Sequence, residues 1–106
     1  MSSTNARALD ILDDAGRLLS TDRNAIYGDA LPDFRRIGEV WAALLDLPLP
    51  IAPHTVAAML AGLKLVRTQI TPEHRDSWAD CSAYAALGWG VGDGGRTISQ
   101  QTDAQR

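Results

Sequence analysis

The chain has 106 residues, of which 45% are hydrophobic and 22% are charged, and its formal net charge at pH 7 is −3. This length predicts one domain with a modest core. The mild negative charge argues against a protein that coats a nucleic acid polymer, because phosphate binding needs a basic surface. The single cysteine, Cys81, excludes an internal disulfide, and no Cys/His cluster has the spacing of a zinc site.

No apolar run reaches the roughly 20 residues of a membrane-spanning helix. The first residues, Met1 to Arg7, lack the charged and then apolar pattern of a signal peptide. We therefore expect a protein of the bacterial cytoplasm, made by the bacterium or by something that replicates in it, with no membrane partner.

The first half of the chain predicts two helices and a loop between them. Apolar residues recur at helical spacing from about Asn5 to Ser20. The segment Thr21 to Ala30 is rich in turn-forming residues and is expected to be a loop. Pro32 suits the first turn of a second helix, which ends near Leu45. Its apolar face is formed by Phe34, Ile37, Trp41 and Leu44.

The second half predicts two more helices. The third opens at Pro53 and ends near Ile70, and the apolar residues expected to face the core are Val56, Met59, Leu60, Leu63 and Val66. Thr71-Pro72-Glu73 is a typical helix start, with a cap, a proline and an acid. The fourth helix is expected to end near Gly88 and to turn Trp78, Cys81 and Ala85 inward.

The predicted fold class is therefore all-α, with about four helices in one domain over residues 1–91. The last two are expected to pack as an antiparallel hairpin, because very few residues join them. The polar segment 92–106 is expected to be a flexible tail. In the hairpin, residues equidistant from the turn face each other, which places Arg67 opposite Asp76 and Lys64 opposite Asp80.

Two interpretations of these four charged residues remain open. They could be salt bridges that fix the register of the two helices. Alternatively, Lys64 and Arg67 could bind a phosphate, while Asp76 and Asp80 orient them or hold a divalent cation.

The loop between the first two helices holds a second candidate site. Tyr27 could stack on a base while Arg23 binds its phosphate, and Tyr84 on the fourth helix is another stacking candidate. The alternative is local, with Tyr27 filling the edge of the core and Arg23 capping the first helix.

Carboxylates on the first helix offer a third candidate. Asp10, Asp13 and Asp14 can share one helix face, and together with Asp76 and Asp80 they could form a magnesium site. The alternative is a solvated acidic surface. His54 and His74 lie in or beside turns and are interpreted as surface residues. No serine lies in a nucleophile-elbow pattern, and no glycine-rich phosphate loop follows a strand.

An ordered series of motifs runs from Ala8 to Gly88: Arg23 … Tyr27-Gly28-Asp29, Phe34 with Trp41, Lys64-Leu65-Val66-Arg67, and His74-Arg75-Asp76-Ser77-Trp78-Ala79-Asp80 … Tyr84-Ala85. In these motifs the chain resembles a family of small uncharacterised proteins encoded mainly by tailed bacteriophages and prophages. The resemblance implies a phage or prophage origin and transfers no activity.

The chain has a fainter similarity to the all-α nucleotide pyrophosphohydrolases of the MazG-like group. That group is helical and oligomeric, and it holds magnesium through two carboxylate motifs on neighbouring helices. Its Glu-Glu-x-x-Glu run is absent here, where Asp10-x-x-Asp13-Asp14 is the nearest substitute, and Asp76 and Asp80 are four residues apart rather than three.

We expect binding rather than catalysis, with no cofactor. The leading hypothesis is a small helical homo-oligomer that sequesters a nucleotide or a cyclic-nucleotide-like signal, in the manner of phage counter-defence proteins. One alternative is a magnesium-dependent nucleoside triphosphate pyrophosphohydrolase. The other is an inhibitor that blocks a host protein through an exposed helical face.

Overall fold

The computed structural model describes residues 3–20 and 29–92, and these residues form four α-helices and no strand. The helices are α1 (Thr4–Ser20), α3 (Ala30–Leu44), α4 (Pro53–Ile70) and α5 (Arg75–Val91). The predicted all-α class is therefore confirmed. Arg23 and Tyr27, and the predicted tail from residue 93 onward, lie outside the described residues.

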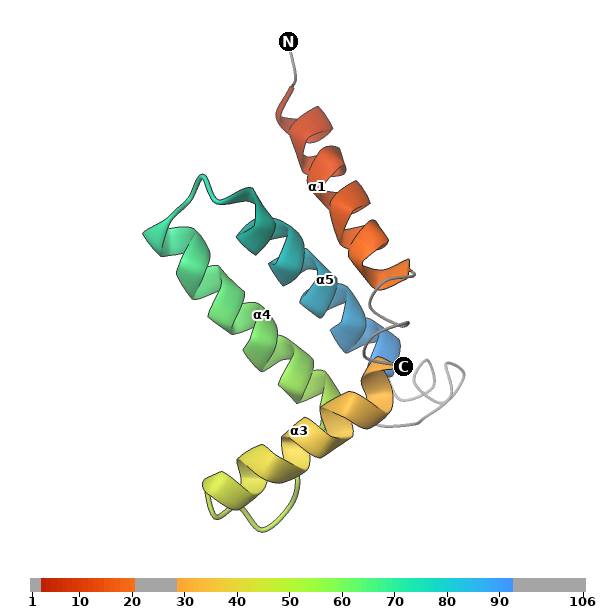
Figure 1. Cartoon of the computed structure of the whole chain (residues 1–106), viewed down its shortest axis with the longest axis vertical. Coiled ribbons are helices and arrows are strands. Elements are labelled where there is room, and N and C mark those ends of the chain that lie inside the picture. The colour runs from red at the N-terminus through yellow and green to blue at the C-terminus, as the bar shows by residue number, and fades with distance from the viewer. Residues whose placement is uncertain (1–2, 21–28, 93–106) are drawn as a thin grey trace, which may run out of the picture.

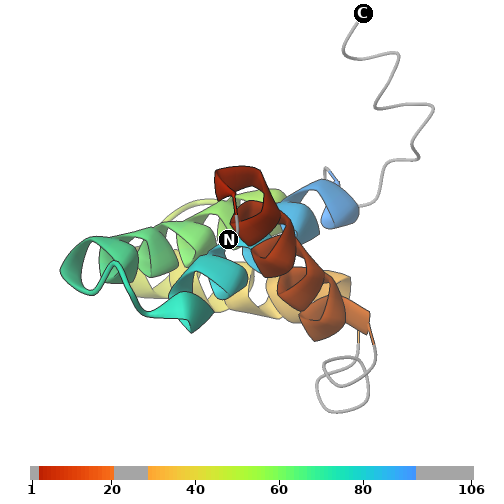
Figure 2. The ribbon, with the colours of Figure 1, turned by 90° about the horizontal axis from the view of Figure 1, so that it is seen from above.

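Helices α1, α5 and α4 lie side by side as a layer, and α3 lies across one end of these three helices (Figure 1). In Figure 1, α4 and α5 run antiparallel and α1 lies along the other side of α5. Helix α3 crosses the lower end of this layer, and its far end extends beyond α4. Figure 2, seen from above, places α3 beneath α4 and α5. The predicted antiparallel hairpin is thus present as α4 and α5.

Local sequence signals account for the starts of α3 and α4. The side chain of Asp29 accepts a hydrogen bond from the backbone N–H of Leu31 and so caps α3, and Pro53 occupies the first turn of α4. The predicted start of the last helix at Pro72 is wrong. Residues 71–74 form a turn closed by a 3.1 Å hydrogen bond from the His74 N–H to the Thr71 carbonyl, and α5 begins at Arg75.

The core lies where α3 crosses the α4–α5 hairpin. Its buried residues are Ala30, Phe34, Val56, Ala57 and Val91. Phe34 is the only aromatic residue among them, and Trp41, Ile51, Leu60 and Tyr84 pack around the cluster while partly exposed. The expectation that α3 turns Phe34 and Trp41 towards the core is correct.

Helix α4 is rotated away from the expected orientation. Met59, Leu63 and Val66 are exposed, whereas the small residues Ala57 and Ala61 are buried. Small residues allow α4 and α5 to lie close together: a Cβ added to Gly88 of α5 would lie 3.4 Å from the Cβ of Ala57. The hairpin therefore packs through small residues, and the larger apolar residues of α4 are left outside.

Helix α5 departs from the prediction in a similar way. Ala79 and Ala83 are buried, whereas Trp78 and Ala85 are exposed and Cys81 is half-buried. Because α5 lies between α1 and α4, it needs two buried faces, and small residues satisfy both. A helix that packs on two sides does not show the single apolar stripe that identifies, in a sequence, a helix packed on one side.

None of the helices in the described residues is long and apolar enough to cross a membrane.

Candidate functional site

The predicted pairing of charges across the hairpin is half correct. The Nζ of Lys64 lies 2.9 Å from Oδ2 of Asp80, in a partly buried ion pair between α4 and α5. No ion pair joins Arg67 to Asp76 within residues 3–20 and 29–92, although both side chains are exposed. In the register that pairs Lys64 with Asp80, Arg67 lies beside Ser77 and not beside Asp76.

Arg67 instead borders an open groove of about 860 Å³ at the turn end of the hairpin, which we call the α4 groove. Its volume is in the range of small-molecule sites. One wall is apolar and comes from α4, through Met59, Leu63, Val66 and Ile70, with Gly62 between them. The other wall is polar and is formed by Arg67, Thr71, His74 and Ser77.

The polar wall is held in place by the turn and by the first residues of α5. Nδ1 of His74 and the hydroxyl of Ser77 share a 2.9 Å hydrogen bond, and the Ser77 N–H donates to the His74 carbonyl. Behind them Thr68 is fully buried, and its hydroxyl donates to the carbonyl of Leu65. These contacts fix His74 and Ser77 beside Arg67.

The electrostatics of the α4 groove favour an anion. None of the carboxylates in the described residues lines it, and the guanidinium of Arg67 has neither an ion pair nor a side-chain hydrogen bond to any other described residue. Arginine presents a planar set of donors that suits phosphate and carboxylate groups. The α4 groove therefore combines an available cation with an apolar wall.

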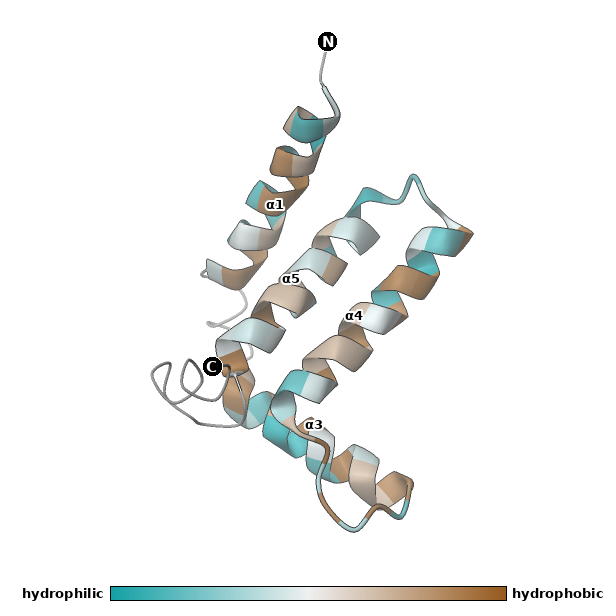
Figure 3. Cartoon of the chain, turned by 180° about the vertical axis from the view of Figure 1, so that it is seen from behind, coloured by the Kyte–Doolittle hydropathy of each residue, from teal (hydrophilic) through white to brown (hydrophobic). Residues whose placement is uncertain are grey.

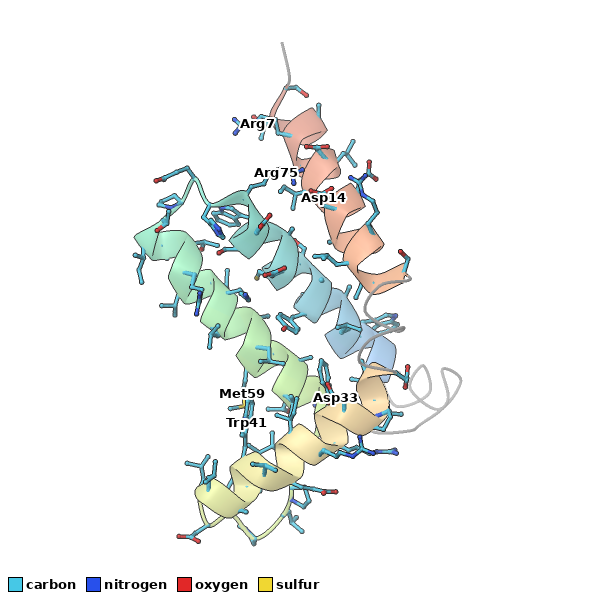
Figure 4. The ribbon with its side chains drawn as sticks, in the orientation of Figure 1. Arg7, Asp14, Asp33, Trp41, Met59 and Arg75 are labelled. Atoms are coloured by element: carbon cyan, nitrogen blue, oxygen red, sulfur yellow. The ribbon has the colours of Figure 1, made fainter. Side chains whose placement is uncertain are left out.

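A second groove, of about 670 Å³, lies between α1 and the start of α5, and charges of both signs line it: Arg7, Asp10, Glu73 and Arg75. Arg75 contacts Asp14 and donates to Oδ2 of Asp10 at 2.7 Å, so one arginine joins the two helices (Figure 4). Asp14 also pairs with Arg17. The contacts of Arg75 attach α1 to α5. The carboxylates of Asp10 and Glu73 in its lining distinguish this groove from the α4 groove.

The sequence-predicted site residues do not all meet. Arg67 lines the α4 groove, whereas Lys64, Asp76, Asp80 and Tyr84 are not among the residues that line it. Lys64 is paired with Asp80, and Tyr84 packs against the core cluster. The proposed roles of Arg23 and Tyr27 fall outside the described residues.

The predicted carboxylates also do not meet as a cluster. Within the described part of the chain, no group of three or more His, Cys, Asp or Glu side chains is placed to hold a metal ion. Asp10 and Asp14 face Arg75, and Asp80 faces Lys64.

Sequence reasoning missed His74, Ser77 and Thr71. His74 was expected to be an isolated surface residue, because it has no partner at a recognisable catalytic spacing. The signal that could have identified it is its position in the turn: a hairpin brings the residues of its turn back beside the last turn of the preceding helix, which holds Arg67.

The family model described as "Domain of unknown function (DUF6378)" matches residues 10–92. The chain belongs to this family. The Gene 55 protein of Mycobacterium phage D29 is 33% identical over 75 residues, which cover 71% of this chain and 48% of that protein. The Gene 55 protein of Mycobacterium phage L5 is 30% identical over 79 residues, covering 74% of this chain and 50% of that protein.

These comparisons confirm the predicted relationship to a family of phage proteins. The chain spans about half the length of these two relatives. No solved structure matches the chain.

Proposed function

We propose that this protein binds a nucleotide or a cyclic-nucleotide-like signal in the α4 groove and holds it without converting it. The observation that supports this proposal is Arg67, an arginine with no ion pair to any described residue, which borders a groove free of carboxylates. A phosphate would bind the guanidinium of Arg67, with Thr71, His74 and Ser77 as further hydrogen-bonding partners.

The apolar wall suits the other half of such a ligand. A nucleobase is flat and largely apolar on its faces. Leu63, about one helical turn before Arg67, and Val66, directly before Arg67, offer aliphatic surface in the same groove. The sequence suggested that a base stacks on Tyr84. Because Tyr84 packs against the core, the proposal assigns the base contact to Leu63 and Val66.

Thermal-shift measurements test the proposal with ATP, dATP, cyclic di-GMP and cyclic ADP-ribose, each with and without magnesium. A ligand that binds only the native state raises the melting temperature by mass action. Ligand recovered intact after heat denaturation supports sequestration. Loss of the ligand only when magnesium is present would instead support the pyrophosphohydrolase alternative.

A matched pair of variants locates the site. Arg67→Ala should weaken the affinity for the best ligand about 10- to 100-fold, because hydrogen bonds to charged groups contribute about 1.5–3 kcal/mol. Arg36→Ala removes the same charge from an exposed position on α3 and should leave the affinity unchanged. Equal effects of the two substitutions would refute the assignment of the site.

A further inference from the structure

Helix α4 carries a row of large apolar side chains that the rest of the described chain leaves exposed. The row, here called the α4 stripe, consists of Met59, Leu63, Val66 and Ile70, whose exposed fractions are 43%, 50%, 61% and 77%. Figure 3 shows hydrophobic residues recurring along α4 and at the far end of α3. A continuous exposed apolar surface of this kind indicates a binding surface.

The spacing of the residues in the α4 stripe indicates what kind of structure could pack against it. Its members follow each other at intervals of four, three and four residues, which is the spacing of the contact positions in a coiled coil. Such a row lies along one straight line of the helix and fits another helix with the same pattern. The spacing therefore favours another helix as the partner of the α4 stripe.

The segments of this chain outside the described residues have too few large apolar residues to cover the α4 stripe. Residues 93–106 contain one large hydrophobic residue, Ile98, among glycine, serine, glutamine and charged residues. Residues 21–28 contain only Ile26 and Tyr27. Neither segment repeats the apolar spacing of the stripe, whereas a second copy of α4 repeats it fully.

We propose that two copies of the chain pack through their α4 stripes, antiparallel and about a two-fold axis. The axis passes between residues 64 and 65, so that Leu63 faces Val66 of the partner subunit and Met59 faces Ile70 of the partner subunit. A two-fold contact of this type is self-complementary and closes as a dimer.

Charge decides between the antiparallel and the parallel arrangement. Lys64 and Arg67 are the only charged residues of α4, and Lys64 is neutralised by Asp80. In a parallel dimer the two Arg67 guanidinium groups would lie side by side and repel each other. In the antiparallel dimer Arg67 faces Gly62 of the partner subunit, where a Cβ would meet nothing within 4 Å in the single chain.

The dimer also changes the α4 groove, and this consequence alone rests on the proposed function. Helix α4 of the partner subunit would cover Leu63 and Val66, while Arg67, Thr71 and His74 would stay at the boundary between the subunits. The dimer would therefore keep the proposed phosphate contact at Arg67, but the proposed contact of a base with Leu63 and Val66 would be open only in the single chain.

Light scattering coupled to size-exclusion chromatography tests the interface. The wild-type chain should have twice the mass of one chain across the micromolar range, and Leu63→Glu should have the mass of one chain. Leu65→Glu is the matched control, because Leu65 is 48% exposed but lies about 160° around α4 from Leu63. Circular dichroism of each variant checks that the helices remain folded.

Disulfide crosslinking tests the antiparallel direction in a Cys81→Ala background. A mixture of Met59→Cys and Ile70→Cys chains should form crosslinked dimers, since these positions face each other. Met59→Cys alone should not, because its two copies would be separated by 11 residues of helix, about 16 Å, which is beyond the reach of a disulfide. Efficient crosslinking of Met59→Cys alone would overturn the antiparallel arrangement.

Different experimental results would refute the proposed dimer and the proposed ligand site. A monomeric wild-type chain, or a Leu63→Glu variant that is still dimeric, would overturn the interface whatever the chain binds. A dimer whose melting temperature responds to none of the nucleotides would support the interface and count against the proposed function.

Discussion

Gly38 is predicted to be the least replaceable glycine of the described helices. It lies on the buried face of α3, directly against the backbone of Ile51 in the connector that leads to α4. The N–H of Ile51 donates a 3.2 Å hydrogen bond to the Gly38 carbonyl. A Cβ at position 38 would lie well under 3.0 Å from the Ile51 carbonyl oxygen and 3.1 Å from its carbon.

The cost of Gly38→Ala follows from this contact. The connector must move away from α3 by about an ångström, which weakens the hydrogen bond from Ile51 and its packing on the core. Overpacking of this kind costs about 1–3 kcal/mol, and a lost hydrogen bond costs about 1 kcal/mol. Alanine recovers about 1 kcal/mol through its higher helix propensity. The net expectation is a loss of about 1–3 kcal/mol in the free energy of unfolding.

Urea denaturation followed by circular dichroism measures this loss, with Gly16→Ala as the control. Gly16 is exposed in α1 and a Cβ there meets nothing within 4 Å, so alanine should stabilise the protein by roughly 0.5–1 kcal/mol. A Gly38→Ala variant as stable as Gly16→Ala would refute the close approach of α3 to residue 51.

Two further predictions concern the ion pairs between helices. A double-mutant cycle on Lys64→Ala and Asp80→Ala should give a coupling energy of about 0.5–1 kcal/mol in urea denaturation, because the 2.9 Å pair is only partly buried; a coupling of zero would contradict a formed pair. Arg75→Ala should raise the rate of amide hydrogen exchange in α1 more than in α4, because Asp10 and Asp14 of α1 lose their contacts with Arg75; equal changes in both helices would contradict this role.

The helices were largely predictable from the sequence because their signals are local. Pro53 at the start of α4 and Asp29 before α3 act through their own backbone neighbours, and the apolar spacing around Phe34 and Trp41 reflects a single buried face. The antiparallel hairpin followed from the short connection alone.

The orientation of α4 could not be predicted in this way. Hydrophobic spacing identifies the most apolar face, and in α4 that face is the stripe that includes Leu63 and Val66. The hairpin instead buries Ala57 and Ala61, because small residues allow the closest approach to α5. Hydrophobic spacing alone cannot distinguish a face that is buried within the chain from a face that the chain leaves exposed.

The candidate site was predictable only in part, for a related reason. Arg67 was identified from its position near the hairpin turn, and Lys64 was correctly placed opposite Asp80. His74 and Ser77 line the α4 groove beside Arg67, which sequence spacing placed opposite Asp76. A difference of one residue in the register of the two helices is enough to exchange one neighbour for another.

The measurement that tests the central claim most directly is a nitrogen–proton correlation NMR titration of the assigned protein with the nucleotide that gives the largest thermal shift. Binding in the α4 groove predicts that the amide signals of Arg67, Thr71, His74 and Ser77 move most, and that Arg67→Ala requires about 10- to 100-fold more ligand for the same changes. Signals that move mainly in the groove between α1 and α5, or no movement with any nucleotide, would contradict the claim.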